Sequence, residues 1–153
     1  MVNNENYRMS VGKKAEKLIC DMMIELGFKV FNFGYEYIFP QLADKTNLLK
    51  GQSGEFIRSI PDFLIVDQET NHAYLIEVKF RKNTELDEKD RADFPETHIV
   101  LVSPEGILIA DNEYIMDNDR EDVFCLLTEI GPFRKKDKNV IMKYVRRARE
   151  EFQ

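Results

Sequence analysis

The sequence predicts an α/β fold in which a central mixed β-sheet of about five strands is flanked by helices, with a helix first in the chain. An amphipathic helical pattern opens the chain, apolar runs of strand length fill its middle, and a second amphipathic pattern closes it. With 153 residues, the chain is long enough for one hydrophobic core and too short for two ordinary domains. We therefore expect a single domain over residues 1–153.

The first predicted element is a helix. Ser10 is a suitable N-cap for a helix that runs to about Leu26, and Gly27 is a suitable C-terminal stop. Glu16 lies at the edge of the apolar stripe of this helix, where a carboxylate can reach into an adjacent cleft. A solvated glutamate without function is the ordinary alternative for a single residue of this kind. The stripe consists of Val11, Ala15, Leu18, Ile19, Met22 and Leu26.

The next segment alternates with a period of two. Residues 29–39 carry aromatic side chains on one face, which predicts one long strand with that face packed against the first helix. Residues 40–58 are polar and contain glycines, so we expect a loop that is longer than usual and that contacts the substrate. Arg58 leads from this loop into the following strand.

Two apolar runs in the middle of the chain predict a β-hairpin. Residues 60–66 and 74–80 have strand composition, and the polar residues between them form a turn. If Asp67 and His72 close a four-residue loop, Asp62 lies directly opposite Glu77. Lys79 then shares their face, and a shift of one residue would separate the two carboxylates.

The chemistry of these three side chains indicates a metal site. Two facing carboxylates repel each other, which raises a pKa or recruits a cation, and a hard divalent ion prefers oxygen ligands. The alternative is a surface hairpin with an ion pair between Glu77 and Lys79. The strands are too apolar for that, since unpaired charge is costly in buried runs. Asp62, Glu77 and Lys79 therefore predict a Mg²⁺ site beside a phosphodiester, as in a nuclease.

The remaining elements follow from the same patterns. Residues 84–93 predict a short exposed helix, and residues 98–102 and 106–110 predict two strands joined by a turn. Residues 119–129 predict a second short helix. A basic amphipathic helix is expected at about residues 138–152, with Ile141, Tyr144, Val145, Ala148 and Phe152 on its apolar stripe.

The order of Ala15-Glu16, Pro61-Asp62 and Glu77-Val78-Lys79 resembles the PD-(D/E)XK nuclease superfamily, whose members include Holliday-junction resolvases. The resemblance covers roughly residues 10–110 and implies a restriction-endonuclease-like core. It also implies that Asp62, Glu77 and the Val78 backbone carbonyl bind Mg²⁺, with Mn²⁺ as a substitute. Glu16 would complete the acidic cluster as a further candidate ligand, and Lys79 would lie beside the attacking water. Members often carry Gln or Lys on the helix after the third strand, where this chain is acidic.

Charge is distributed unevenly along the chain. The net charge of −6 argues against a simple nonspecific DNA-binding protein, which usually shows a basic footprint. Two basic clusters, one around Lys13 to Lys17 and one at Arg81 and Lys82, nevertheless predict phosphate contacts, and residues 130–153 form a third basic segment whose ligand, phosphate or protein, stays open. The predicted nucleic-acid-binding residues are Lys13, Lys14, Lys17, Arg58, Arg81 and Lys82.

These observations predict a metal-dependent endonuclease acting on DNA, with RNA left open as a substrate. The alternative is a non-catalytic or partner-dependent nucleic-acid-binding or assembly subunit that keeps the nuclease fold, which the acidic composition favours. A protein partner and a homodimer through exposed apolar residues of the C-terminal helix are further expected assemblies. No apolar run approaches the ~20 residues of a membrane span, and Cys20 and Cys125 suggest no disulfide framework. We therefore expect a cytoplasmic protein without a membrane partner.

Overall fold

The computed structural model describes residues 4–41, 49–83, 94, 96–111 and 124–153. Its centre is a six-stranded mixed sheet in which the strands follow one another in chain order. Neighbouring strands are antiparallel except for β3 and β4, which are parallel. The strands are β1 (Phe28–Asn32), β2 (Phe63–Asp67), β3 (Ala73–Phe80), β4 (Thr97–Ser103), β5 (Gly106–Asp111) and β6 (Cys125–Leu126). The expected α/β class, the mixed sheet and the leading helix are confirmed, and the described sheet has one short strand more than expected.

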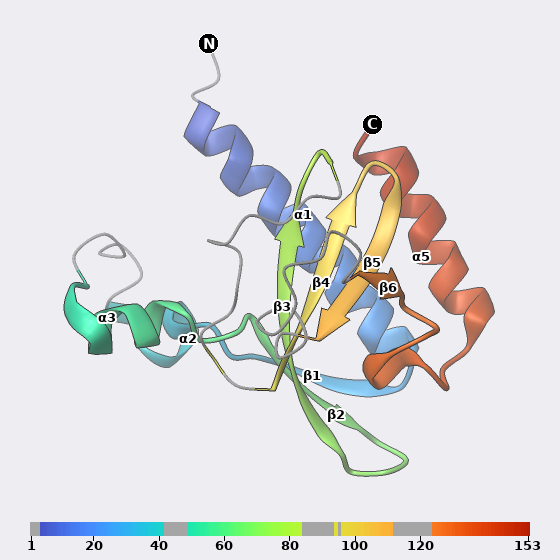
Figure 1. The fold of residues 1–153 in the computed structure, drawn as a ribbon, viewed down its shortest axis with the longest axis horizontal. Coiled ribbons are helices and arrows are strands. Elements are labelled where there is room, and N and C mark those ends of the chain that lie inside the picture. The colour runs from blue at the N-terminus through green and yellow to red at the C-terminus, as the bar shows by residue number, and fades with distance from the viewer. Residues whose placement is uncertain (1–3, 42–48, 84–93, 95, 112–123) are drawn as a thin grey trace.

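Two long helices cover one face of the sheet, as Figure 1 shows. α1 (Asn4–Glu25) lies against β1 and β3, and α5 (Lys138–Glu151) lies against β4, β5 and α1. Alternate strand residues such as Ile76, Val78 and Val100 point toward these helices and join one buried apolar cluster with them. Glu77, which lies between Ile76 and Val78 in sequence, therefore points away from this cluster. None of the described helices is long and apolar enough to cross a membrane.

The hairpin of β2 and β3 has the expected register. Phe63 pairs with Ile76 and Val66 pairs with Ala73, so that paired residue numbers have the same sum as Asp67 and His72. The Asp67 amide donates to the His72 carbonyl over 2.9 Å, which closes the four-residue turn. Turn length fixes hairpin register, and the prediction is therefore confirmed.

Two predicted boundaries near the N-terminus are wrong. α1 begins at Asn4, so Ser10 lies inside the helix and is not its N-cap. Gly27 does end the helix, with a φ of 94° that favours glycine. β1 ends at Asn32, and the chain then turns into the short helix α2 (Tyr35–Ile38), so residues 29–39 do not form one strand.

The aromatic face of the predicted long strand does not pack against α1. Phe31 is half exposed, and the Phe33 ring instead meets the Phe94 ring at 6.3 Å. The Phe56 ring stacks on Phe94 at 5.3 Å and comes from α3 (Gly51–Arg58), a helix within the segment expected to be a loop. α2 and α3 lie on the side of the molecule away from α5 (Figure 1).

The later elements agree with the sequence in part. β4 and β5 confirm the two strands and the turn between Ser103 and Gly106. The helix expected over residues 119–129 is wrong for its described part, because Cys125–Leu126 forms β6 and a turn follows it. Pairing with the edge of β5 explains this difference, since it supplies backbone partners to a segment with weak helical periodicity. The helix expected over residues 84–93 lies outside the described residues.

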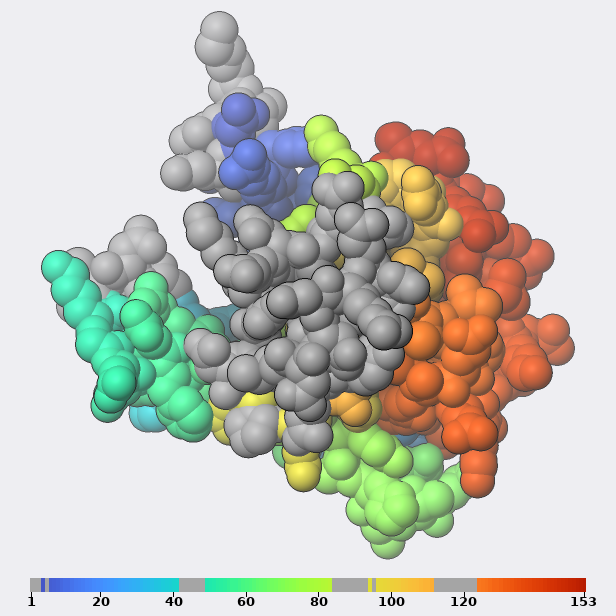
Figure 2. Space-filling model, viewed as in Figure 1, coloured from blue at the N-terminus to red at the C-terminus, as the bar shows by residue number. Residues whose placement is uncertain are grey.

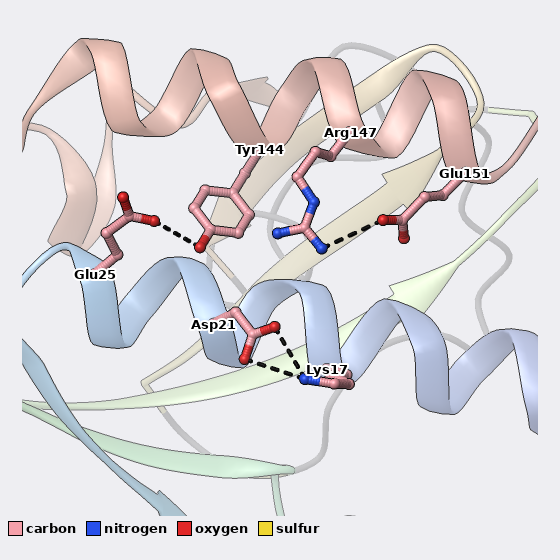
Figure 3. Close-up of polar contacts among 6 residues, drawn as sticks. All are labelled: Lys17, Asp21, Glu25, Tyr144, Arg147 and Glu151. Atoms are coloured by element: carbon pink, nitrogen blue, oxygen red, sulfur yellow. Dashed lines mark hydrogen bonds and ion pairs between the residues drawn. The ribbon is translucent and has the colours of Figure 1, made fainter.

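α5 confirms the expected C-terminal helix. The Asp137 carboxylate caps it by accepting a hydrogen bond from the Asn139 amide over 2.8 Å. Its apolar stripe faces the core, where Ile141, Tyr144 and Ala148 are buried and Val145 and Phe152 are partly buried. A homodimer through exposed apolar residues of this helix stays a prediction, and Met142 is such a residue outside the stripe. Glu25 of α1 ties the two helices together by accepting from the Tyr144 hydroxyl over 2.6 Å (Figure 3), and it also pairs with Lys143.

Substitutions at two adjacent positions of α5 test this packing. Ile141 is fully buried, whereas the neighbouring Met142 is 46% exposed. Ile141→Ala should lower the free energy of unfolding by about 2–4 kcal/mol, because it leaves a cavity between α5 and the sheet. Met142→Ala should lower it by less than about 1 kcal/mol. Urea unfolding followed by circular dichroism measures the unfolding free energy of both variants. A larger decrease for Met142→Ala than for Ile141→Ala would contradict the assignment of Ile141 to the buried face of α5.

Candidate functional site

The candidate site begins where the ladder between β2 and β3 ends. One residue beyond the pair Phe63–Ile76, the register places Asp62 opposite Glu77, and the next position places Pro61 opposite Val78. Pro61 has no amide hydrogen and cannot donate to the Val78 carbonyl. The Asp62 carboxylate occupies the gap and accepts a hydrogen bond from the Val78 amide over 2.8 Å. Its side chain thus replaces backbone pairing at this point.

Asp62 also determines where β1 ends. Its backbone carbonyl accepts from the Phe33 amide over 2.8 Å and from the Gly34 amide over 3.3 Å. Two successive amides that bend toward one oxygen cannot continue an extended ladder. The chain therefore leaves the sheet after Asn32 and enters α2, which brings Glu36 toward Asp62.

Glu77 and Lys79 lie on one face of β3, as expected from their spacing. The Lys79 Nζ is 3.4 Å from the Glu77 Oε1, and the two side chains are 28% and 16% exposed. The ion pair is thus largely shielded from solvent, where charges interact more strongly than on an open surface. The structure brings together Asp62, Glu77 and Lys79, the three residues that the hairpin register predicted.

Glu16 reaches the same region from α1. It is half-buried, next to the fully buried Ala15. Its pKa is raised to about 7. Burial is the largest cause, and the nearby carboxylates of Asp62 and Glu36 also contribute. Glu16 therefore lies within electrostatic reach of the pair on the hairpin.

The two hairpin carboxyls also hold protons more tightly than usual. Burial is the main cause of the raised pKa of Asp62, about 6, and the hydrogen bond from Val78 and the charge of Lys79 act against it. Burial and then the Asp62 charge raise the pKa of Glu77 to about 8, despite its ion pair with Lys79. A cation placed between these carboxylates would favour their ionised forms.

Glu36 is a member of this acidic group that the sequence did not reveal. Its charge raises the pKa values of both Glu16 and Asp62. The sequence predicted a strand over residues 29–39, and a strand there does not indicate that Glu36 lies near α1 and the hairpin. The only available signal was indirect: two carboxylates in apolar strands, Asp62 and Glu77, suggest that further acidic residues lie nearby.

The donor set fits a hard divalent cation held by few protein ligands. Among the described residues, no three His, Cys, Asp or Glu side chains converge on one point, so Glu16 does not share a single set of ligands with Asp62 and Glu77. Mg²⁺ is commonly held by one or two carboxylates, with water and substrate phosphate completing its octahedron. Asp62 and Glu77 meet that requirement, and the Val78 carbonyl opposite Pro61 is a suitable third oxygen.

The predicted basic residues fall into different places. Lys13 lies close enough to Glu16 to lower its pKa, and Lys14 is exposed one residue further along α1. Lys17 pairs with Asp21 over 3.1 Å on the surface of α1 (Figure 3). Arg58 is exposed in the last turn of α3.

Arg81 and Lys82 are placed differently. Together with Lys79, they line a cleft of about 820 Å³ between the start of α1 and the end of β3. The cleft also includes Tyr7 and Arg8 of α1, which the sequence did not identify because the helix was expected to begin at Ser10. The acidic pair and a basic cleft thus meet at Lys79.

Comparison of the chain with protein-family models, with curated proteins and with solved structures finds no match.

The raised pKa of Glu77 predicts a pH-dependent stability in metal-free buffer. A carboxyl whose pKa rises from 4.5 to about 8 on folding stabilises the folded state fully below pH 4.5, and this contribution is lost as the pH rises toward 8. Glu77→Gln should therefore raise the free energy of unfolding at pH 8 by roughly 1–3 kcal/mol. At pH 5 the effect should be small, because Glu77 is then protonated in the folded state.

Urea unfolding of both proteins at pH 5 and pH 8, with EDTA present, measures this difference. Other titrating groups such as His98 are common to the two proteins, so their effects cancel in the comparison. The exposed Glu105 provides a control, since Glu105→Gln should change stability little at either pH. An equal effect of Glu77→Gln at both pH values would contradict the assigned proton affinity.

Proposed function

We propose that this protein is a metal-dependent endonuclease that hydrolyses phosphodiester bonds of DNA. The observation that supports this most directly is the shared face of Asp62 and Glu77 at the end of the hairpin, with the Lys79 ammonium 3.4 Å from Glu77. Phosphoryl transfer needs positive charge near the scissile phosphate and a positioned nucleophile. Burial raises the pKa values of both carboxyls, and a bound cation would favour their ionised forms while it supplies the positive charge near the phosphate.

The residues of the chain divide this work among them. Asp62 and Glu77 would hold Mg²⁺, with the Val78 carbonyl as a further oxygen, and Mn²⁺ would be accepted in its place. When bound, the ion neutralises phosphate charge and acidifies a water. Lys79 lies beside this pair, where its ammonium orients the attacking water and stabilises negative charge as it develops on the phosphate. Glu16 adds negative charge beside the pair and strengthens its hold on the cation.

We further propose a restriction-endonuclease-like core. The order of elements supports it, with a leading helix, three antiparallel strands and a fourth strand parallel to β3. The carboxylates lie at the junction of β2 and β3, and Glu16 approaches from the leading helix. These positions are consistent with the resemblance to the PD-(D/E)XK nucleases.

The second candidate is a nucleic-acid-binding or assembly subunit without catalysis of its own. The net charge of −6 favours it, because an acidic protein is repelled by a polyanion unless a partner or a metal intervenes. The ion pair between Lys79 and Glu77, which is largely shielded from solvent, opposes it. Burying charge in an apolar strand is costly and needs a compensating role.

Cleavage assays with labelled DNA and Mg²⁺ test the proposal. The wild-type protein should cleave, and EDTA should abolish cleavage. Lys79→Ala and Asp62→Asn should each lower the rate by about 10²–10³-fold, because each removes a group that acts on the charge of the transition state. A panel of linear, forked, four-way and single-stranded DNA identifies the preferred substrate. The same panel made of RNA tests whether the protein distinguishes deoxyribose from ribose.

Lys29→Ala is the matched control for the loss of a lysine. Lys29 is exposed on β1, and its substitution should leave the rate unchanged. Folding of each variant is checked by circular dichroism. Full cleavage by folded Lys79→Ala would reject the role of that residue, and absence of cleavage on every substrate would favour the non-catalytic subunit.

A further inference from the structure

We infer that the cleft between the start of α1 and the end of β3 binds an unpaired stretch of the nucleic acid, so that the substrate carries single-stranded DNA next to the bond that is cut. This inference rests on the proposed nuclease function and identifies its substrate class. Figure 2 shows the start of α1 and the end of β3 side by side at the surface. The described lining consists of Asn4, Tyr7, Arg8, Val11, Gly12, Val78, Lys79, Phe80, Arg81 and Lys82.

The charge of the cleft selects an anionic ligand. Arg8, Arg81 and Lys82 line it together with Lys79, and its described lining contains no Asp or Glu. This is unusual in a chain with a net charge of −6. Guanidinium and ammonium groups on two facing elements can contact successive phosphates of one strand.

Its aromatic residues distinguish a nucleotide from a simple anion. Tyr7 is 55% exposed although it is large and partly apolar. Phe80 on the opposite wall is half-buried and packs against the Phe152 ring at 5.0 Å, so Tyr7 offers the more exposed ring. Aromatic rings interleaved with basic side chains are the usual means of binding unpaired bases, because every base offers a face for stacking. Paired bases in a duplex hide those faces.

The size of the cleft favours a single strand. Its volume is about 820 Å³, within the range of clefts that enclose small ligands, and this suits a few nucleotides. A duplex is read by inserting protein into its grooves, the major one about 12 Å wide, and would lie over this cleft instead of inside it.

The cleft leads to the acidic pair. Lys79 lines it and also contacts Glu77, and Gly12 lines it one helical turn before Glu16. A Cβ at Gly12 would meet no atom within 4 Å, so space is open over the helix at this point. A strand that lies along Arg8 and Gly12 thus reaches Asp62 and Glu77, where its backbone would be cut.

Binding is tested first, with fluorescence anisotropy of a short labelled single-stranded DNA in Ca²⁺. Tyr7→Ala and Arg8→Ala should each weaken binding about tenfold, from lost stacking and a lost phosphate contact. Met9→Ala changes an exposed residue of the same helix that does not line the cleft, and Lys29→Ala removes a distant positive charge. Neither control should weaken binding. Equal losses in the controls, or none in the cleft variants, would overturn the assignment.

Cleavage in Mg²⁺ is then compared on a splayed fork and on a fully paired duplex of the same sequence. The wild-type protein should cut the fork at least about tenfold faster, and Tyr7→Ala should lower the ratio of the two rates. Equal wild-type rates would overturn the cleft assignment while leaving the nuclease intact. If the protein cuts nothing but its binding still depends on Tyr7 and Arg8, the nuclease proposal fails and the cleft assignment stands. Binding of single-stranded RNA alone would overturn the choice of DNA.

Discussion

The hydrogen bond from the Val78 amide to the Asp62 carboxylate determines the geometry of the candidate site. Pro61 ends the ladder between β2 and β3 because it has no amide hydrogen to donate, and the Asp62 carboxylate accepts the hydrogen bond from the Val78 amide in place of a backbone carbonyl. This fixes the carboxylate opposite Glu77. The carbonyl of the same residue turns the chain out of the sheet after β1. Asp62 thus ends the ladder of β1 and places Glu36 near Glu16, while Pro61 ends the ladder between β2 and β3.

Such an arrangement destabilises an apoprotein. Burial and mutual repulsion raise the pKa values of Glu16, Asp62 and Glu77, so ionising them near neutral pH costs free energy of folding. The apolar cluster beneath α1 and α5 tolerates this cost, since its side chains are almost completely buried. Sites that depart from local rules of stability are commonly functional. A cation or phosphate-bound metal would reverse the penalty, which relates the instability directly to the proposed activity.

Sequence patterns predicted the elements whose periodicity and turn chemistry agree. The hairpin register followed from a four-residue turn, and α5 from its apolar stripe. Sequence patterns failed where a backbone group that is distant in sequence determines the local structure. The alternation that begins at Lys29 ends because Asp62 accepts hydrogen bonds from Phe33 and Gly34, and no local pattern reveals that. Glu36 was missed for the same reason.

The acidic composition of the chain and its basic cleft can be reconciled by the range of electrostatic interactions. At physiological ionic strength the Debye length is about 8 Å, so a phosphate in the cleft interacts mainly with the groups that line it. Arg8, Arg81 and Lys82 therefore act on that phosphate more strongly than carboxylates elsewhere on the surface. Glu77 is the exception, because it pairs with Lys79, which lines the cleft. Net charge then governs how fast a polyanion approaches, whereas the local arrangement governs where it binds.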